Sequence, residues 1–261
     1  SARANWDGGA VYTFDLGMIA AGLISFGRAT SAPQYLDCGL LVAGELAALI
    51  RQYGELPPVA PTGPSTERPP QWSTAGRVHL VKCIQALLLA EEMDAARSLC
   101  RPALAAQDTE GWWSTQPGDD TVMLHPLLYA VEGMWMAGTA TGDPAPLQAA
   151  GRAVRWVWRH QLPSGGLPRW VSREGTGPEQ ADVTSQALRA AILLEHQPSG
   201  IEQAVQRLVA LTHPDGNFGR ALVYQPQADS THLNVWVSMF GEQALRAAVQ
   251  GPHALDWNTL V

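Results

Sequence analysis

The chain has 261 residues, a net charge of −7 and a sequence pI near 5.4. This acidic balance contains no run of Lys or Arg, so we expect neither nucleic acid nor an anionic membrane surface as a partner. Hydrophobic residues make up 46% of the chain, enough for a large core, and no linker divides it. We therefore predict a single domain over residues 1–261.

The spacing of apolar residues predicts nine helices and no convincing strand. Residues 54–71 are rich in Pro, Gly, Ser and Thr, which predicts a long loop. The helices form four pairs and a last single member, at residues 13–29 and 34–52, 73–92 and 94–106, 121–138 and 144–160, 180–196 and 200–212, and 232–249.

The helix predicted over residues 121–138 is apolar nearly all round, which is typical of a helix inside a molecule. It nevertheless carries His125, Tyr129 and Glu132 at positions i, i+4 and i+7, on one face. Burying these polar groups costs free energy unless they are paired or face a wet cavity. We therefore predict that His125 and Tyr129 line a pocket, and that Glu132 pairs with an arginine of a neighbouring helix.

Three turns between helices share a pattern. Residues 107–113 and 161–167 both begin with Gln and place Gly four residues later, and residues 212–218 keep the Gly and an aromatic residue. Gly permits a tight turn, while a large side chain fills the space between neighbouring hairpins. Helical hairpins of this kind bury their faces by stacking, and about five or six of them close into a ring.

These turns resemble the QW-type repeats of terpene cyclases, and the whole chain resembles the (α/α) toroid superfamily. That superfamily includes terpene cyclases, polysaccharide lyases, uronyl epimerases and several glycosidases. The fragments at residues 12–17, 125–130 and 224–236 are similar to signatures of bacterial toroid proteins from polysaccharide and natural-product gene clusters. The resemblance implies an all-α toroid of about five helical hairpins.

The resemblance also implies where the site lies. In such toroids the active site occupies a bowl at the N-terminal ends of the inner helices. Projected onto this chain, Asp15, His125 and Asp182 are the expected proton-transfer residues, and His232 with Asn234 is expected to hold an anionic group. The expected substrate-binding residues are Tyr12, Trp72, Asp120, Tyr129, Arg169, Tyr224, His232, Asn234 and Trp236.

Each candidate also has a purely structural interpretation. Asp15, Asp120 and Asp182 could be helix caps or first-turn acids, which the helix dipole favours. His125 could be a hydrogen-bonded core histidine. The cysteines Cys38, Cys83 and Cys100 match no zinc motif or disulfide framework, and we interpret them as buried thiols of a cytoplasmic protein.

The leading hypothesis for function is cofactor-independent acid/base catalysis on a small polar or sugar-like substrate. The reaction would be a lyase-like elimination or ring closure on a polysaccharide-derived or natural-product intermediate. A glycoside hydrolase is one alternative. A terpene cyclase of the protonating type is another, because residues 117–122 match three of the five fixed positions of its Asp-x-Asp-Asp-Thr-Ala signature.

The remaining hypothesis is a non-catalytic toroid subunit of a complex. Nine helices leave a ring with a helix missing, and a second copy or a related toroid subunit could cover the exposed flank. We expect no metal site, because no Cys and His set suited to zinc is apparent. No apolar run reaches about 18 residues and no signal peptide is apparent, so we expect no membrane span.

Overall fold

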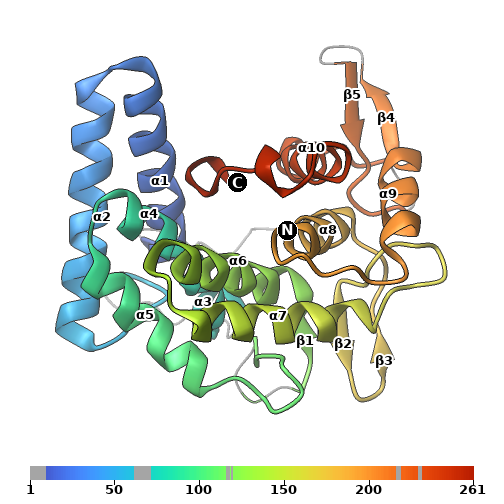
Figure 1. Cartoon of the computed structure of the whole chain (residues 1–261), viewed down its shortest axis with the longest axis horizontal. Helices are drawn as coiled ribbons and strands as arrows, with labels where there is room; N and C mark the ends of the chain where they lie inside the picture. The colour runs from blue at the N-terminus through green and yellow to red at the C-terminus, as the bar shows by residue number, and fades with distance from the viewer. Residues whose placement is uncertain (1–9, 62–71, 116–117, 119, 216–218, 229–230) are drawn as a thin grey trace, which may run out of the picture.

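The structure is a computed structural model that describes residues 10–61, 72–115, 118, 120–215, 219–228 and 231–261. Helices dominate these residues, which confirms the predicted all-α class. The helices form a ring of inner members with the outer members around its outside (Figure 1).

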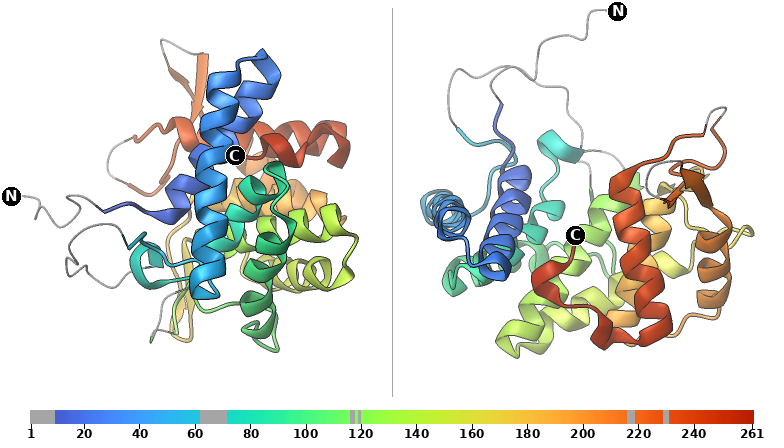
Figure 2. Two further views of the ribbon diagram at one scale, coloured as in Figure 1. Left: turned by 90° about the vertical axis from the view of Figure 1, so that its left-hand side faces the viewer. Right: turned by 90° about the horizontal axis from the view of Figure 1, so that it is seen from above.

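Three hairpins follow the prediction to within three residues at each helix end. The first pairs α1 with α2, the third pairs α6 with α7, and the fourth pairs α8 with α9 (Figures 1 and 2). A last inner helix, α10, follows alone. The bounds are α1 Thr13–Thr30, α2 Pro33–Tyr53, α6 Leu124–Thr141, α7 Pro144–Trp158, α8 Ala181–Leu193, α9 Ile201–Ala210 and α10 Val235–Gln250.

The second hairpin differs from the prediction of one continuous helix over residues 73–92. The chain forms α3 (Trp72–Ala75), the 3₁₀ helix η2 (Val78–Cys83) and α4 (Ile84–Leu89) before the outer helix α5 (Met93–Ala105). Gly76 lies at the first break, where its low helix propensity favours an interruption. Helix α6 packs so closely on η2 that a side chain at Gly133 would collide with the Val81 carbonyl oxygen.

The prediction of no strands was wrong. Strands β1 (Val122–Met123), β2 (Trp170–Ser172) and β3 (Gly175–Thr176) form an antiparallel sheet, and β4 (Thr212–Asp215) pairs with β5 (Gly219–Leu222). Strands of two to four residues are too short to show the alternation by which a strand is recognised in a sequence. The β1–β2 pairing brings the segment after α7 beside the first residue of α6.

The Gln-x3-Gly turns are confirmed as a structural repeat. The Gln107 Nε2 atom donates to the carbonyl oxygens of Gly111 and Ala149, both at 2.8 Å. The Gln161 Nε2 atom makes the same two bonds, also at 2.8 Å, to Gly165 and Gly200. Each glutamine thus ties its own turn to the next outer helix. In the third predicted turn, residues 212–215 form β4, and residues 216–218 lie outside the described part of the chain.

A buried ion cluster lies at the axis of the ring. The Glu132 carboxylate of α6 accepts from Arg189 of α8 and lies 2.9 Å from the Lys82 Nζ atom of η2. This confirms the expected arginine partner of Glu132. Burial alone would raise the pKa of Glu132, but Arg189 and Lys82 hold it below its usual value. One carboxylate therefore ties together three inner segments.

A C-terminal segment lies between the last and the first inner helix, beside this cluster. It contains η3 (Pro252–Ala254) and η4 (Trp257–Thr259), which pack on α10 and on α1 respectively. Side chains of the inner helices donate to its backbone, for example Gln85 to the Trp257 carbonyl oxygen at 2.7 Å and Arg189 to that of Val261 at 3.0 Å.

Two side features complete the fold. Cys83 and Cys100 are buried as predicted, and burial raises the pKa of each thiol to about 12. Cys38, however, is exposed on α2, because it lies on the outer surface of an outer helix. None of the described helices is long and apolar enough to cross a membrane.

We expect Gln161→Ala to lower the free energy of unfolding by about 1–3 kcal/mol, because it removes two hydrogen bonds that join neighbouring hairpins. Urea denaturation measures this change. Gln148→Ala, on the exposed face of α7, is the matched control and should have little effect. Equal losses in the two variants would show that the turn repeat does not stabilise the ring.

Candidate active site

Two titratable side chains meet where two inner helices begin. His125 is the second residue of α6 and Asp182 the second residue of α8. The His125 Nδ1 atom lies 3.4 Å from the Asp182 Oδ2 atom. The other carboxylate oxygen, Oδ1, accepts from the Val183 amide at 2.8 Å, which orients the carboxyl group. The structure therefore brings together two of the three predicted proton-transfer residues.

The surroundings of Asp182 favour its protonated form. Burial raises the pKa of this carboxyl, and the charges of His125 and Arg169 only partly oppose the shift. His125 retains 20% of its side-chain exposure, against 6% for Asp182, so the pair is reached from the histidine side. A carboxyl with a raised pKa beside an imidazole is an arrangement that can pass a proton to or from a bound molecule.

An aromatic wall lies beneath this pair. The Tyr129 ring meets the His125 ring edge-on at 4.5 Å between centroids and contacts Phe14 at 4.8 Å. The Tyr129 hydroxyl accepts from the Trp236 Nε1 atom of α10 at 3.3 Å. Burial raises the pKa of the Tyr129 phenol, so it stays protonated and acts as a hydrogen-bonding group. Tyr129 and Trp236 were both predicted to shape the pocket.

His79 of η2 belongs to the same wall and was missed in the sequence. It is 1% exposed and lies 5.4 Å from the Phe14 ring. Burial, followed by the charge of His125, lowers its pKa to about 3, so His79 is neutral at physiological pH. A signal was available, because His79 and Lys82 interrupt an apolar run at helical spacing, as His125 and Glu132 do in α6.

The rim beside α8 is formed by residues far apart in the sequence. Gln180 donates its side-chain amide to the Tyr224 hydroxyl, and the Tyr224 carbonyl oxygen accepts from the Ala181 amide at 3.1 Å. The Tyr224 and His232 rings are perpendicular, with centroids 5.5 Å apart. Arg169 is exposed nearby, and its charge acts on both Asp182 and Tyr224. Gln180, which is buried, was not predicted from the sequence.

The structure gives the other predicted site residues different surroundings. Asp15 is exposed in the first turn of α1, although partial burial of its carboxyl raises its pKa. Asp120 forms a surface ion pair of 3.1 Å with Arg173. Asn234 caps α10 through bonds to two backbone amides. Tyr12 pairs with Val59 of the long loop, and Trp72 begins α3, with its side chain outside the described part of the structure.

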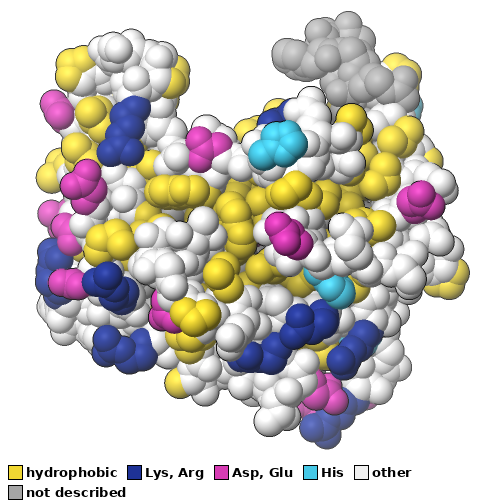
Figure 3. All heavy atoms as spheres, viewed as in Figure 1, with side chains coloured by type: hydrophobic (Ala, Val, Ile, Leu, Met, Phe, Trp, Pro, Cys, Tyr) yellow, Lys and Arg dark blue, Asp and Glu magenta, His cyan; other side chains and the backbone are white. Residues whose placement is uncertain are grey.

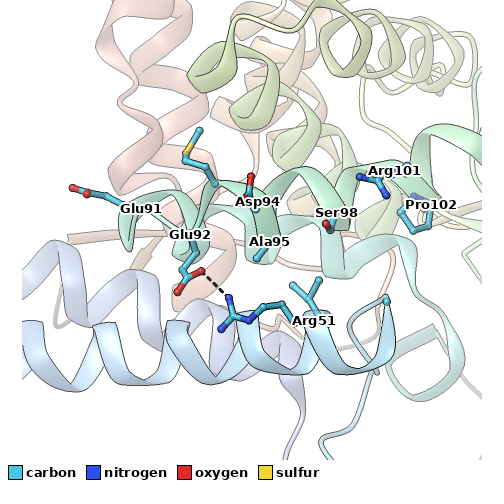
Figure 4. Close-up of a pocket in the computed structure, with 11 residues that line it drawn as sticks. Arg51, Glu91, Glu92, Asp94, Ala95, Ser98, Arg101 and Pro102 are labelled. Carbon is cyan, nitrogen blue, oxygen red and sulfur yellow. Dashed lines mark hydrogen bonds and ion pairs between the residues drawn. The ribbon is translucent and has the colours of Figure 1, made fainter.

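A separate cavity of about 490 Å³ lies between the outer helix α2 and α5 (Figure 4). Its wall carries the Arg51–Glu92 ion pair of 3.1 Å, with Asp94 and Arg101 nearby. Outer helices form this cavity, and none of its described lining residues is a histidine. We therefore place the candidate site at His125 and Asp182. Within the described residues, no three His, Cys, Asp or Glu side chains gather as a metal site would require.

Comparison with solved structures shows the (α/α) toroid fold. The chain is similar to an unsaturated glucuronyl hydrolase from Bacillus sp. GL1, with a TM-score of 0.68 at 13% identity over 91% of this chain and 75% of that one. It is also similar to the cellobiose 2-epimerase of Bacillus thermoamylovorans B4167, with a TM-score of 0.68 at 13% identity over 90% and 72%.

An unsaturated glucuronyl hydrolase specific for heparin gives a TM-score of 0.67 at 15% identity, over 92% of this chain and 76% of that one. No family model and no curated protein matches the sequence. At 13–15% identity the similarity to these structures shows the fold, and a fold does not by itself determine the reaction.

His79 should make stability depend on pH. Its pKa is about 3 in the folded protein and near 6.5 when unfolded, so the unfolded chain binds the extra proton between these values. Stability due to His79 is complete above pH 6.5 and falls by about 1.4 kcal/mol per unit as the pH drops toward 3. His79→Asn should flatten this slope in urea denaturation across that range. The same slope in His79→Asn as in the exposed control His253→Asn would refute the assignment.

Proposed function

We propose that the chain is a cofactor-independent acid/base enzyme that processes a sugar-like substrate in the bowl of the toroid. The observation that carries the proposal is the His125–Asp182 pair at the start of two inner helices, 3.4 Å apart. Inner-helix N-termini add favourable dipole fields for a substrate that becomes more negative during the reaction.

The pair can supply both proton transfers of an elimination. One group removes a proton from a substrate carbon, the bond from the neighbouring carbon to the leaving oxygen breaks, and a protonated group donates its proton to that oxygen. Asp182 suits the acid because burial raises its pKa, and His125 suits the base. After the reaction the proton has moved from one group to the other, and exchange with solvent resets the pair.

The wall and rim support a sugar-like substrate. Trp236 is 37% exposed and offers aromatic surface to a sugar ring, and its hydrogen bond to the buried Tyr129 hydroxyl holds the indole in place. Arg169 adds positive charge near Asp182, which favours an anionic sugar such as a uronate. Two similar structures are described as glucuronyl hydrolases and one as a cellobiose epimerase, and these names agree with a substrate of this class.

A glycoside hydrolase on the same site is the second candidate, since two of the similar structures are described as unsaturated glucuronyl hydrolases. It would use Asp182 as the acid and would need a second group to activate water. The terpene-cyclase alternative has less support. Of its aspartates, Asp119 lies outside the described residues and Asp120 is paired with Arg173 at the surface.

The test is turnover of a panel of saturated uronic-acid oligosaccharides. Elimination creates a double bond conjugated to the carboxylate and raises ultraviolet absorbance, whereas hydrolysis releases a reducing end without one. We expect His125→Ala and Asp182→Asn each to lower kcat at least about a hundredfold, because each removes a proton-transfer group.

The control is Asp94→Asn, on the exposed surface of α5, which should retain full activity. Far-UV circular dichroism of each variant verifies the fold. Unchanged turnover in His125→Ala and Asp182→Asn would exclude the pair from catalysis, and absence of turnover on the whole panel would exclude uronic-acid oligosaccharides as substrates.

A further inference from the structure

A stripe of arginines runs along the outer helix α7. It consists of Arg152 and Arg155 within the helix and Arg159 at its C-terminal end, and all three are exposed. Their spacing of three and four residues places them on one face. The space-filling view shows Lys and Arg side chains gathered over α7 (Figure 3). Because the whole chain has a net charge of −7, this positive face is a local feature that its composition does not predict.

The stripe keeps its positive charge. Within the described residues, none of its three guanidinium groups lies within ion-pair distance of an Asp or Glu side chain, whereas Arg97 of α5 pairs with Asp94 at 3.2 Å. The Arg152 Nε atom donates to the Gln107 Oε1 atom at 3.1 Å, and this acceptor is neutral. The hydrogen bond therefore orients Arg152 without cancelling its charge.

The charge of the stripe also acts on the histidines beside it. Partial burial and then the charge of Arg155 lower the pKa of His196, which lies just beyond the end of α8. Partial burial and then the charge of Arg159 lower the pKa of His160, with Glu110 opposing the shift. A positive potential therefore extends from α7 to the end of α8, where it favours an anionic ligand.

A groove of about 630 Å³ runs beside the stripe. Its lining includes Arg152 and Arg155 of α7, Leu193 at the end of α8 and the partly exposed Trp135 of α6, and Glu195 adds one negative charge. Trp135 follows His125 by ten residues, which is about 15 Å along a helix. The groove is therefore separate from the candidate active site.

Gly151 leaves the surface of α7 bare within this groove. It lies inside the helix and lines the groove. A methyl group at this position would meet only the Arg155 Nη1 atom, at 3.4 Å, so packing against another element does not require glycine here. Glycine destabilises a helix interior relative to alanine. At position 151 it keeps the space beside the Arg155 guanidinium open to a ligand.

We propose that this groove is a second binding site for an acidic saccharide, outside the bowl. Arg152 and Arg155 would bind sugar carboxylates, since a guanidinium pairs with a carboxylate through two parallel hydrogen bonds. Trp135 and Leu193 would contact the apolar face of a sugar ring. The preference for an anion rests on the stripe, and the choice of a saccharide rests on the proposed function. A long chain held in the groove would raise the local concentration of sugar units near the bowl.

Isothermal titration calorimetry with a hexasaccharide of galacturonic acid tests the proposal. We expect Arg155→Glu to weaken binding at the groove at least about tenfold, because it replaces a carboxylate-binding group with a repelling charge. Gly151→Leu should also weaken binding by filling the groove, while the circular dichroism spectrum stays unchanged. Arg97→Glu is the matched control, since Arg97 is 58% exposed on another helix and the change in charge is the same. It should bind as the unmodified chain does.

The bowl variant Asp182→Asn separates this proposal from the proposed function. Groove binding should persist in Asp182→Asn and be lost when Arg155→Glu is added, whether or not the chain turns over any saccharide. Turnover of a disaccharide should be the same in Arg155→Glu as in the unmodified chain. Equal hexasaccharide affinity in Arg155→Glu and Arg97→Glu would overturn the proposal. Tighter binding of a hexaglutamate peptide than of the hexasaccharide at this groove would overturn it as well, because the groove would then be a peptide site.

Discussion

The buried pair of Glu132 and Arg189 sets the relation between the two helices that carry the site. Glu132 follows His125 by seven residues in α6, and Arg189 follows Asp182 by seven residues in α8. Seven residues are about two helical turns, so each ion-pair residue lies directly below a site residue. Because α6 and α8 run in the same direction, locking the lower pair in register places His125 opposite Asp182. Lys82 adds η2 to the same carboxylate, which brings His79 to the wall of the site.

The cost of an unpaired buried charge explains why several groups surround this cluster. A buried ion pair that loses one partner leaves an uncompensated charge, at a cost of about 3–5 kcal/mol. Here the cations are satisfied from several directions, since Arg189 also contacts Gln243 and the Val261 carbonyl oxygen. The C-terminal segment therefore helps to satisfy the buried charges of the cluster, and the same hydrogen bonds hold the segment in place.

Much of this could be predicted from the sequence, and the failures have physical causes. Long apolar helices and the Gln-x3-Gly turns have strong periodic signals, so eight of the nine predicted helices were found close to their true bounds. The face of His125, Tyr129 and Glu132 was predicted because helical spacing places them together. By contrast, the break before η2, the short strands and the contact of Gln180 with Tyr224 depend on distant packing. Asp15, Asp120 and Asp182 look alike in the sequence, and only their surroundings distinguish a buried acid from a surface one.

The fold hosts hydrolases and an epimerase among the similar structures, so the bowl itself must decide the function. The most direct measurement is a crystal structure of Asp182→Asn soaked with a saturated uronic-acid disaccharide. We expect the sugar at the N-terminal ends of α6 and α8, with one oxygen within hydrogen-bonding distance of the side chain at position 182 and the carboxylate near Arg169. Sugar bound only in the cavity between α2 and α5, or an empty bowl at saturating concentration, would contradict it.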